Sequence, residues 1–290
     1  GRPGQGPAPA GPPRRFSPAT LAYGTAALVV VVVILIVVLV SGGGGKSQSP
    51  GPAVTPASPS VLQAITGVSQ GQANTVGVPS GLNAPKTATG QPALTSGGKP
   101  EALYIGAEFC PYCGAERWAL IMAFSRFGTF SGLKETTSSP YDSPPAVATF
   151  TFANAHYTSN LVDFTMVENE SNDTSGLGTR HVLQPLTKAQ QDLWTKYSAQ
   201  FGLQSTGFPF VDFGNKVFVL GPTYNPQVLL GLDQGQIAQK LSNPSDPVTQ
   251  AVVGAANYVT AAICDLTGNQ PSSVCSASGT TAAAKQIGLS

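Results

Sequence analysis

Charged residues are scarce in this sequence. They make up 10% of its 290 residues, and the formal net charge is +1. Nucleic-acid binding needs a surface rich in Lys and Arg, so this charge balance predicts no nucleic-acid partner. The sequence also has no acidic tail. Histidine is rarer still, and neither His156 nor His181 has the spacing of a metal ligand. We therefore expect no resident metal and no cofactor.

Long apolar runs are also missing, with one exception. Residues 21–40 carry no charge and end in the unbroken aliphatic run 29–40. A helix of about 20 such residues crosses a hydrocarbon core of about 30 Å. Because no second run of this length exists to pair with it, the sequence predicts a protein that spans the cell membrane once and is anchored by residues 21–40.

The charges that flank the apolar run predict its orientation. Arg14 and Arg15 precede it, and only Lys46 follows closely. The positive-inside rule then places the N-terminus in the cytoplasm and the C-terminal domain outside it. A cleaved signal peptide is the alternative, with a cut near residues 41–42, but the run exceeds the usual core of about 7–15 residues. Both interpretations place the cysteines outside the cytoplasm.

Proline and glycine crowd into the first hundred residues, and this crowding defines the expected domains. Gly/Pro-rich segments bury little apolar surface, so they predict tails and linkers. The expected order is a disordered cytoplasmic tail (1–15), a transmembrane helix (16–40), a Pro/Gly/Ser-rich linker (41–99) with a short helix near 61–68, and an extracytoplasmic domain (100–290) with an insertion at about 153–204.

The four cysteines form two local pairs, and the first pair has the pattern of a redox site. Cys110 and Cys113 lie between the strand-like run 101–106 and the helix-like run 115–122. A helix start stabilises a thiolate, so we expect Cys110 to be the nucleophile and Cys113 the residue that resolves a mixed disulfide. An inert structural disulfide and half of a zinc site are the alternatives.

The second pair, Cys264 and Cys275, is separated by the turn residues 265–271. Outside the cytoplasm this spacing favours a local structural disulfide that closes the end of the last helix. The alternative is a second redox pair that relays electrons to Cys110 and Cys113.

The order of hydrophobic patterns predicts an α/β fold, with a central sheet flanked by helices. The expected elements are a strand at 101–106, a helix from Cys113 to about 127, a strand at 146–152, an inserted helix at 187–201, a hairpin at 208–220, a helix at 233–241 and a long helix at 248–266. Trp118 and Trp194 lie on helical faces and are expected in the core.

The segment from Ala107 to Cys113 resembles the active-site segment of the thioredoxin fold. Its Cys-Pro-Tyr-Cys tetrad is similar to that of glutaredoxins, and the inserted helix is similar to that of extracytoplasmic disulfide oxidases. The resemblance implies a thioredoxin-like central sheet and a cis-proline before the hairpin, for which Pro209 is the candidate.

A narrower resemblance extends over about residues 60–276. The segments 104–118, 125–128 and 208–212, and the ending that holds Cys264 and Cys275, are similar to DUF929, a membrane-anchored family of unknown function. This resemblance implies a fold and leaves the physiological role open.

One position departs from the thioredoxin pattern. Tyr104 stands six residues before Cys110, where thioredoxins keep a buried acid. This departure disfavours a thioredoxin-type reductant and favours an oxidase or isomerase. Glu108 and Glu116 are expected in solvent. Arg117 either adds positive potential near the thiolate or is a solvated helix charge.

Together these features predict a membrane-anchored thiol-disulfide oxidoreductase outside the cytoplasm, with Cys110, Cys113 and Pro209 at its site. Its partners would be the thiols and disulfides of secreted or envelope proteins, with a membrane redox partner that reoxidises or reduces the pair. The alternative is a non-catalytic thioredoxin-fold module for binding or assembly with two structural disulfides. Metal delivery is a weaker third class, because other soft ligands are scarce.

Overall fold

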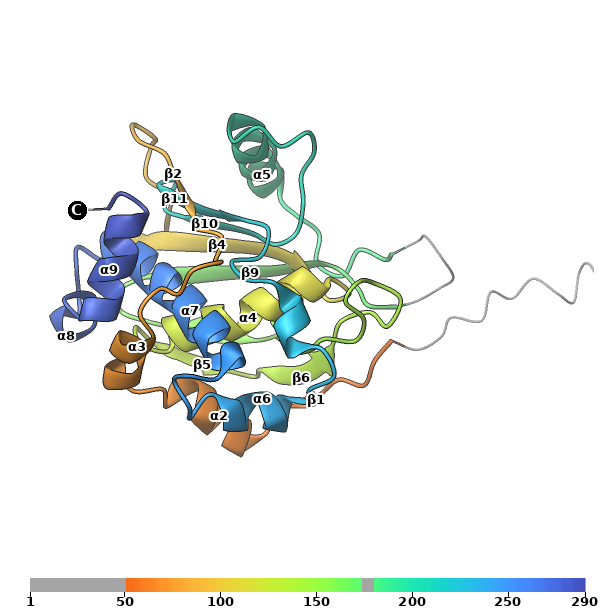
Figure 1. Ribbon diagram of the computed structural model, residues 1–290. Coiled ribbons are helices and arrows are strands. Elements are labelled where there is room, and N and C mark those ends of the chain that lie inside the picture. The colour runs from red at the N-terminus through yellow and green to blue at the C-terminus, as the bar shows by residue number, and fades with distance from the viewer. Residues whose placement is uncertain (1–50, 174–179, 290) are drawn as a thin grey trace, which may run out of the picture. The chain divides into compact units, whose positions relative to one another are not determined.

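A computed structural model describes residues 51–173 and 180–289, which fold as a mixed α/β unit (Figure 1). The expected cytoplasmic tail and transmembrane segment lie outside the described residues. Within the described part of the chain, no helix combines the length and the apolar character needed to cross a membrane.

The centre of the unit is a six-stranded sheet. Four of its strands form the core of the sheet, because β4 pairs in parallel with β9 and antiparallel with β10, and β10 pairs antiparallel with β11. Two short strands, β2 and β3, complete the edges. The bounds are β4 (Lys99–Ala107), β9 (Asp163–Glu170), β10 (Phe210–Phe213), β11 (Val217–Leu220), β2 (Lys86–Thr87) and β3 (Thr95–Ser96).

Helices cover both faces of this sheet. Figure 1 shows α4 (Pro111–Phe124) and α7 (Pro247–Leu266) on one face and α5 (Lys188–Gln200) on the other. Along β4, Tyr104 contributes to the core on the α4 and α7 side, whereas Leu103 and Ile105 contribute to the core beneath α5. A strand buried on both faces is apolar throughout, and this explains the unbroken apolar run in the sequence.

Helix α4 starts directly after β4, and its sequence suits a buried position. Cys110 is its N-cap and Pro111 occupies the first turn, where a missing N–H leaves nothing unsatisfied. The helix is buried nearly all round, so small and apolar residues dominate it. Trp118 is fully buried and donates its indole N–H to Ala148 O at 3.0 Å. The expectation that Trp118 and Trp194 belong to the core is confirmed.

Several local predictions are confirmed. The hairpin joins β10 to β11 around Gly214 and Asn215, which have φ of 66° and 62°. Capping boxes start α5 at Thr187 and α6 (Gln234–Lys240) at Asp233. The long helix α7 begins after the N-cap Asp246, as expected.

The second expected strand forms, but outside the central sheet. The expected strand at 146–152 corresponds to β7 (Ala148–Thr151), which pairs with β6 (Lys134–Thr137) in a separate sheet that also includes β1 (Thr55–Pro56). The strand parallel to β4 is β9, inside the segment read as an irregular insertion. β9 carries several polar residues, among them Glu168, whose charge is balanced by Arg117 from a distant part of the sequence. Sequence patterns cannot reveal that pairing.

The described part of the expected linker is folded onto the domain. Residues 59–76 form α2 (Pro59–Thr66) and α3 (Gln70–Val76), and Ile65 and Ala73 are fully buried. Asn257 of α7 donates to Ala73 O at 2.9 Å. The short helix expected near 61–68 therefore corresponds to α2, and this segment belongs to the same compact unit as the sheet.

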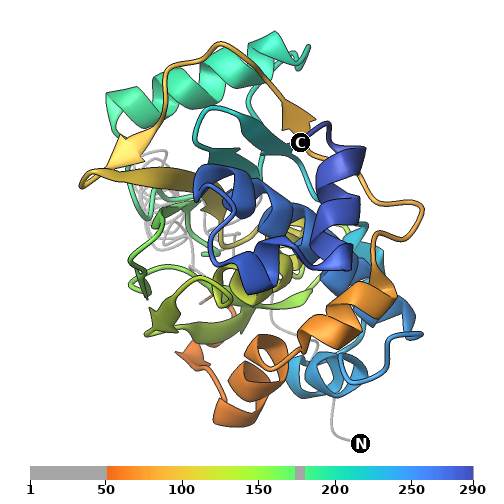
Figure 2. The same cartoon turned by 90° about the vertical axis from the view of Figure 1, so that its left-hand side faces the viewer.

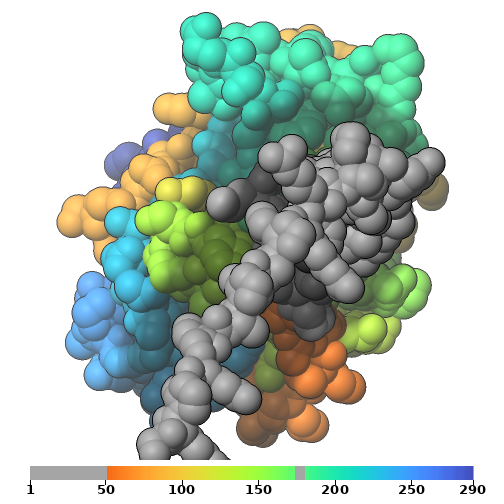
Figure 3. Space-filling model, turned by 90° about the vertical axis from the view of Figure 1, so that its right-hand side faces the viewer, coloured from red at the N-terminus to blue at the C-terminus, as the bar shows by residue number. Residues whose placement is uncertain are grey.

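The remaining elements complete the periphery. They are β5 (Thr129–Ser131), β8 (His156–Thr158), η1 (Pro226–Leu229), α8 (Ser272–Cys275) and α9 (Ser278–Gln286). Figure 2 shows α9 beside α7, on the face of the sheet opposite α5. Seen from the side shown in Figure 3, the residues of α5 form the upper edge of the molecule.

Candidate redox site

The two cysteines of the first pair lie at the start of α4, at the C-terminal end of β4. Cys110 Sγ accepts a hydrogen bond from the backbone N–H of Cys113 at 3.2 Å, so the thiol itself caps the helix. Both residues are free thiols, Cys110 being 4% exposed and Cys113 fully buried. This geometry favours negative charge on Cys110, because a helix start presents unpaired N–H groups and positive potential.

The two thiols have opposite pKa shifts. Burial opposes the Cys110 thiolate, but hydrogen bonds from Cys113 and the charge of Arg117 outweigh it, so the pKa of Cys110 falls below its ordinary value. Burial, together with the hydrogen bond to Cys110 and its charge, raises the pKa of Cys113 well above the ordinary value. Of the two thiols, Cys110 therefore loses its proton more readily, and Cys113 keeps its proton more strongly.

A buried ion pair lies beneath the thiols. Arg117, one turn after Cys113, donates from Nε and Nη2 to the two carboxylate oxygens of Glu168 at 2.8 and 2.6 Å. Both side chains are 0% exposed. Burial works against the charge of Arg117, but Glu168 and other nearby groups outweigh it, so the pKa of Arg117 stays above its usual range. The alternative expectation that Arg117 is a solvated charge on the helix is therefore wrong. Its two hydrogen bonds to Glu168 offset the free-energy cost of burying both charges.

Tyr104 lies in the same buried region, with a hydroxyl that has no hydrogen-bond partner. Burial raises its pKa well above the ordinary value, so the hydroxyl stays protonated. The ring and hydroxyl occupy the space beside Gly106 that a Cβ would fill. Glycine at position 106 therefore leaves room for the Tyr104 side chain.

The segment that precedes β10 lies against the thiols. The Phe208–Pro209 peptide bond is cis, and Phe208 packs against the cluster of Ala107, Cys110 and Cys113. The Phe208 ring meets the Phe109 ring edge-on, with 6.2 Å between centroids. The structure thus brings Pro209, the third expected site residue, to the same region as the two cysteines.

The rim of the site holds Arg180 and Asp142, which the sequence did not single out, and Glu108, which was expected in solvent and is only partly exposed. Arg180 lies over the ring of Phe109, with 4.0 Å between Cζ and the ring centroid, and it pairs with Asp142 at 2.8 Å. Glu108 accepts a hydrogen bond from Thr151 at 2.6 Å, and burial raises its pKa. Neither Arg180 nor Glu168 could be found from spacing, because both come from the segment read as an insertion.

Glu116 is fully buried, so its expected position in solvent is wrong. Its carboxylate accepts two hydrogen bonds from Thr223, one from the backbone N–H and one from the hydroxyl, each 2.8 Å long. Burial raises the pKa of Glu116 to about 7, and these hydrogen bonds oppose the rise. The side chain is buried because α4 packs against α7, β7, η1 and α2, so nearly all of the helix is closed to solvent.

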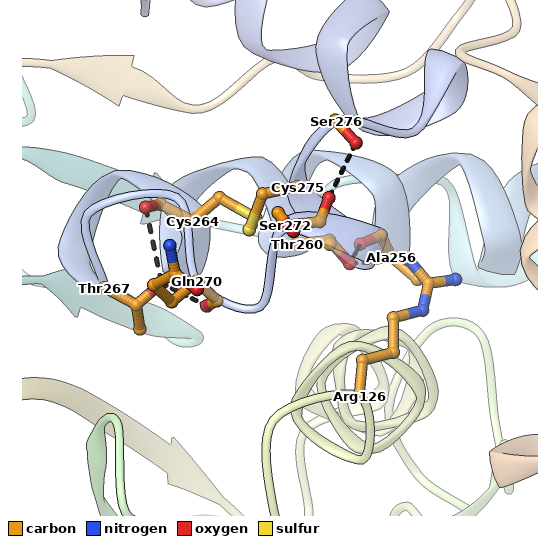
Figure 4. The surroundings of a disulfide bond; sticks show 9 residues. All are labelled: Arg126, Ala256, Thr260, Cys264, Thr267, Gln270, Ser272, Cys275 and Ser276. Carbon is orange, nitrogen blue, oxygen red and sulfur yellow. Dashed lines mark hydrogen bonds between the residues drawn. A yellow bond between two sulfur atoms is a disulfide. The ribbon is translucent and has the colours of Figure 1, made fainter.

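The second cysteine pair is a disulfide between Cys264 and Cys275, with 5.6 Å between the Cα atoms. The expected local disulfide is therefore confirmed. Figure 4 shows it joining the end of α7 to α8. Thr267 donates to Gln270 O at 2.7 Å inside the loop that the disulfide closes.

The two cysteine pairs lie at opposite ends of α4. Cys110 caps the start of this 14-residue helix, which is about 20 Å long. Arg126, just beyond the other end, donates to Thr260 Oγ1 at 2.7 Å, one turn before Cys264 (Figure 4). A direct exchange of sulfur bonds between the pairs of one chain would therefore require a large rearrangement.

No group of three or more His, Cys, Asp or Glu side chains that could hold a metal ion exists among residues 51–173 and 180–289. His156 lies exposed on β8.

These features define a mixed α/β protein with a two-cysteine site where a central strand meets a buried helix. Residues 88–265 match the model of a family described as a domain of unknown function, DUF929. The match covers more than half of the chain, which belongs to that family. Neither the curated proteins nor the solved structures include a significant match to this chain.

Proposed function

We propose that this protein is a membrane-anchored thiol-disulfide oxidoreductase of the thioredoxin fold. It acts outside the cytoplasm on secreted or envelope proteins through Cys110 and Cys113. The observation that carries the proposal is the opposed state of the two thiols. Cys110 caps α4 and has a lowered pKa, whereas the pKa of Cys113 is raised.

The topology supports the thioredoxin part of the proposal. The order β9, β4, β10, β11 combines one parallel and two antiparallel pairings, with α4 following β4 and α7 packing against the same face. The segment at Pro209 enters β10 beside the cysteines, where an extended substrate chain can pair with the backbone.

The thiol states favour oxidation of substrates. A substrate thiolate attacks Cys110 Sγ in the Cys110–Cys113 disulfide, and Cys113 leaves and takes up a proton. A second substrate thiolate then attacks the substrate sulfur of this mixed disulfide, and Cys110 leaves as a thiolate. The substrate loses two electrons and the pair gains them. A stabilised Cys110 thiolate is a good leaving group and makes the pair a stronger oxidant.

The proposed location rests on the sequence. Arg14 and Arg15 before the apolar run 21–40 support an anchor with a cytoplasmic N-terminus. The Cys264–Cys275 disulfide supports an oxidising compartment. A membrane redox partner that accepts electrons from Cys110 and Cys113 would complete the cycle.

A redox titration tests the proposal. The full chain is equilibrated with mixtures of reduced and oxidised glutathione, and the oxidised protein is then mixed with a peptide that carries two thiols. We expect reversible formation of the Cys110–Cys113 disulfide and stoichiometric oxidation of the peptide. Cys110→Ser and Cys113→Ser should each abolish the complete reaction, and only Cys113→Ser should trap a mixed disulfide.

The alternative is a non-catalytic binding module in which both pairs are structural. The near-complete burial of Cys110 and Cys113 favours this alternative. It predicts a Cys110–Cys113 disulfide that resists glutathione and does not oxidise the peptide, so the same titration separates the two functions.

A further inference from the structure

The loop of residues 221–224, which follows β11, joins Pro209 to the helix that bears the cysteines. The backbone N–H of Gly221 donates to Pro209 O at 2.8 Å. Two residues later, Thr223 donates two hydrogen bonds to the Glu116 carboxylate. Tyr224 adds a third bond to the same turn of α4, from its hydroxyl to Ala115 O at 2.6 Å. The 221–224 loop thus ties the first turns of α4 to the backbone at Pro209.

Glu116 is the ionisable side chain among these hydrogen-bonded groups. It is 0% exposed, and no cation forms an ion pair with it in the described part of the chain. A carboxylate without a cation is costly to bury, and its two hydrogen bonds both come from Thr223, itself 1% exposed. These two bonds hold the 221–224 loop against α4.

The loop therefore connects the two walls of the candidate site through hydrogen bonds. One wall is the start of α4 with Cys110, and the other is the backbone at Pro209, which is bonded to Gly221. We propose that Glu116 is a positioning residue that holds these walls at the separation that admits one extended substrate chain. This inference rests on the proposed function and names a residue, outside the cysteine motif, that governs substrate access.

Two disulfide probes separate substrate docking from sulfur chemistry. The first is an extended peptide whose cysteine is disulfide-bonded to thionitrobenzoate, and the second is the small symmetrical disulfide of thionitrobenzoate. The Cys110 thiolate of the reduced full chain attacks either probe and displaces a thiolate. Cys113 then loses its proton and displaces the group bound to Cys110. Both probes release thionitrobenzoate, which is measured by its colour.

The main variant is Thr223→Val, which removes one hydrogen bond to Glu116 and preserves the shape of the side chain. The matched control is Thr149→Val, because the Thr149 hydroxyl is equally buried and donates to Gly114 O of α4 at 2.7 Å. Thr149 has no connection to the 221–224 loop. Glu116→Gln is a second variant, which removes the ionisable carboxyl group. Its amide oxygen can still accept from the Thr223 backbone N–H, whereas its NH2 group can only donate, so the hydrogen bond to the Thr223 hydroxyl must reverse its direction.

We expect Thr223→Val to raise the peptide concentration at half-maximal rate about tenfold, as for the loss of one hydrogen bond to a charged group. The maximal rate and the rate with the small disulfide should stay unchanged, and Thr149→Val should behave as the wild type. An unchanged half-saturation in folded Thr223→Val and Glu116→Gln overturns the inference, as does an equal effect of Thr149→Val. A wild-type chain that reacts with neither probe overturns the proposed function as well.

Discussion

The buried pair of Arg117 and Glu168 allows a quantitative test of the electrostatics beneath the thiols. Replacing Arg117 by Met removes two hydrogen bonds to Glu168 and leaves its carboxylate in a region with 0% exposure. The backbone N–H of Phe152, 3.2 Å from Glu168 Oε1, is then one of few remaining donors. Breaking such a pair from one side costs about 3–5 kcal/mol.

The expected loss is large enough to measure by thermal unfolding. For a domain of roughly 150–250 residues, about 1 kcal/mol shifts Tm by about 2–4 °C, so Arg117→Met should lower Tm by about 10 °C. The double variant Arg117→Met with Glu168→Gln removes both charges and should regain most of this loss. In both variants the pKa of Cys110 should rise, because the charge of Arg117 favours the thiolate.

The assay is a double-mutant cycle of unfolding free energies, with the exposed pair Lys188 and Asp192 as control. Those side chains are 86% and 62% exposed, so Lys188→Met should cost less than about 1 kcal/mol. If Arg117→Met is as stable as the double variant, the buried Glu168 carboxylate does not depend on Arg117 for its stability. The interpretation of a coupled buried pair would then be refuted.

Three further results are expected. Replacing Cys264 and Cys275 by Ser should lower the unfolding free energy by roughly 3 kcal/mol, because the disulfide closes a loop of sequence separation 11. The rate of thiol exchange at Cys110 should stay unchanged, and a slower exchange would support a relay between the two pairs. Burial raises the pKa values of Glu116 and Asp212 to about 7, so both favour folding below their unfolded pKa near 4. The unfolding free energy should therefore fall as pH rises from about 4 to about 7 and level off above, and Glu116→Gln and Asp212→Asn should flatten this fall in urea titrations. Tyr104→Phe should change Tm little, because the lost hydroxyl has no partner; a loss of more than about 2 kcal/mol would contradict this.

Local signals in the sequence predicted much of the fold. The caps at Thr187 and Asp233, the Gly214-Asn215 hairpin and the helix after Asp246 all depend on neighbouring residues, and the structure has each of them. The partner of β4 depends on contacts between distant residues. The polar residues of β9 were read as irregular structure because the partner of Glu168 lies 51 positions away.

In the candidate site, too, the features that depend on neighbouring residues could be predicted, and those that depend on distant contacts could not. The thiolate at Cys110 follows from a Cys-Pro sequence at a helix start, and the local pairing of Cys264 with Cys275 follows from their spacing. The burial of Glu116 and Arg117 could not be predicted, because charged residues usually face solvent and their partners come from other elements. The contribution of Thr223 likewise could not be predicted, because the loop after β11 meets α4 only in the folded chain.

The central claim, that Cys110 is an activated thiolate, can be tested by alkylation. The reduced full chain is treated with iodoacetamide at a series of pH values, and the modified cysteine is identified by mass spectrometry. The account predicts that Cys110 reacts first, with a pH midpoint below that of a free cysteine, and that Cys113 reacts only on unfolding. A Cys110 that stays unreactive in the folded chain, or that titrates like an ordinary thiol, would contradict the account.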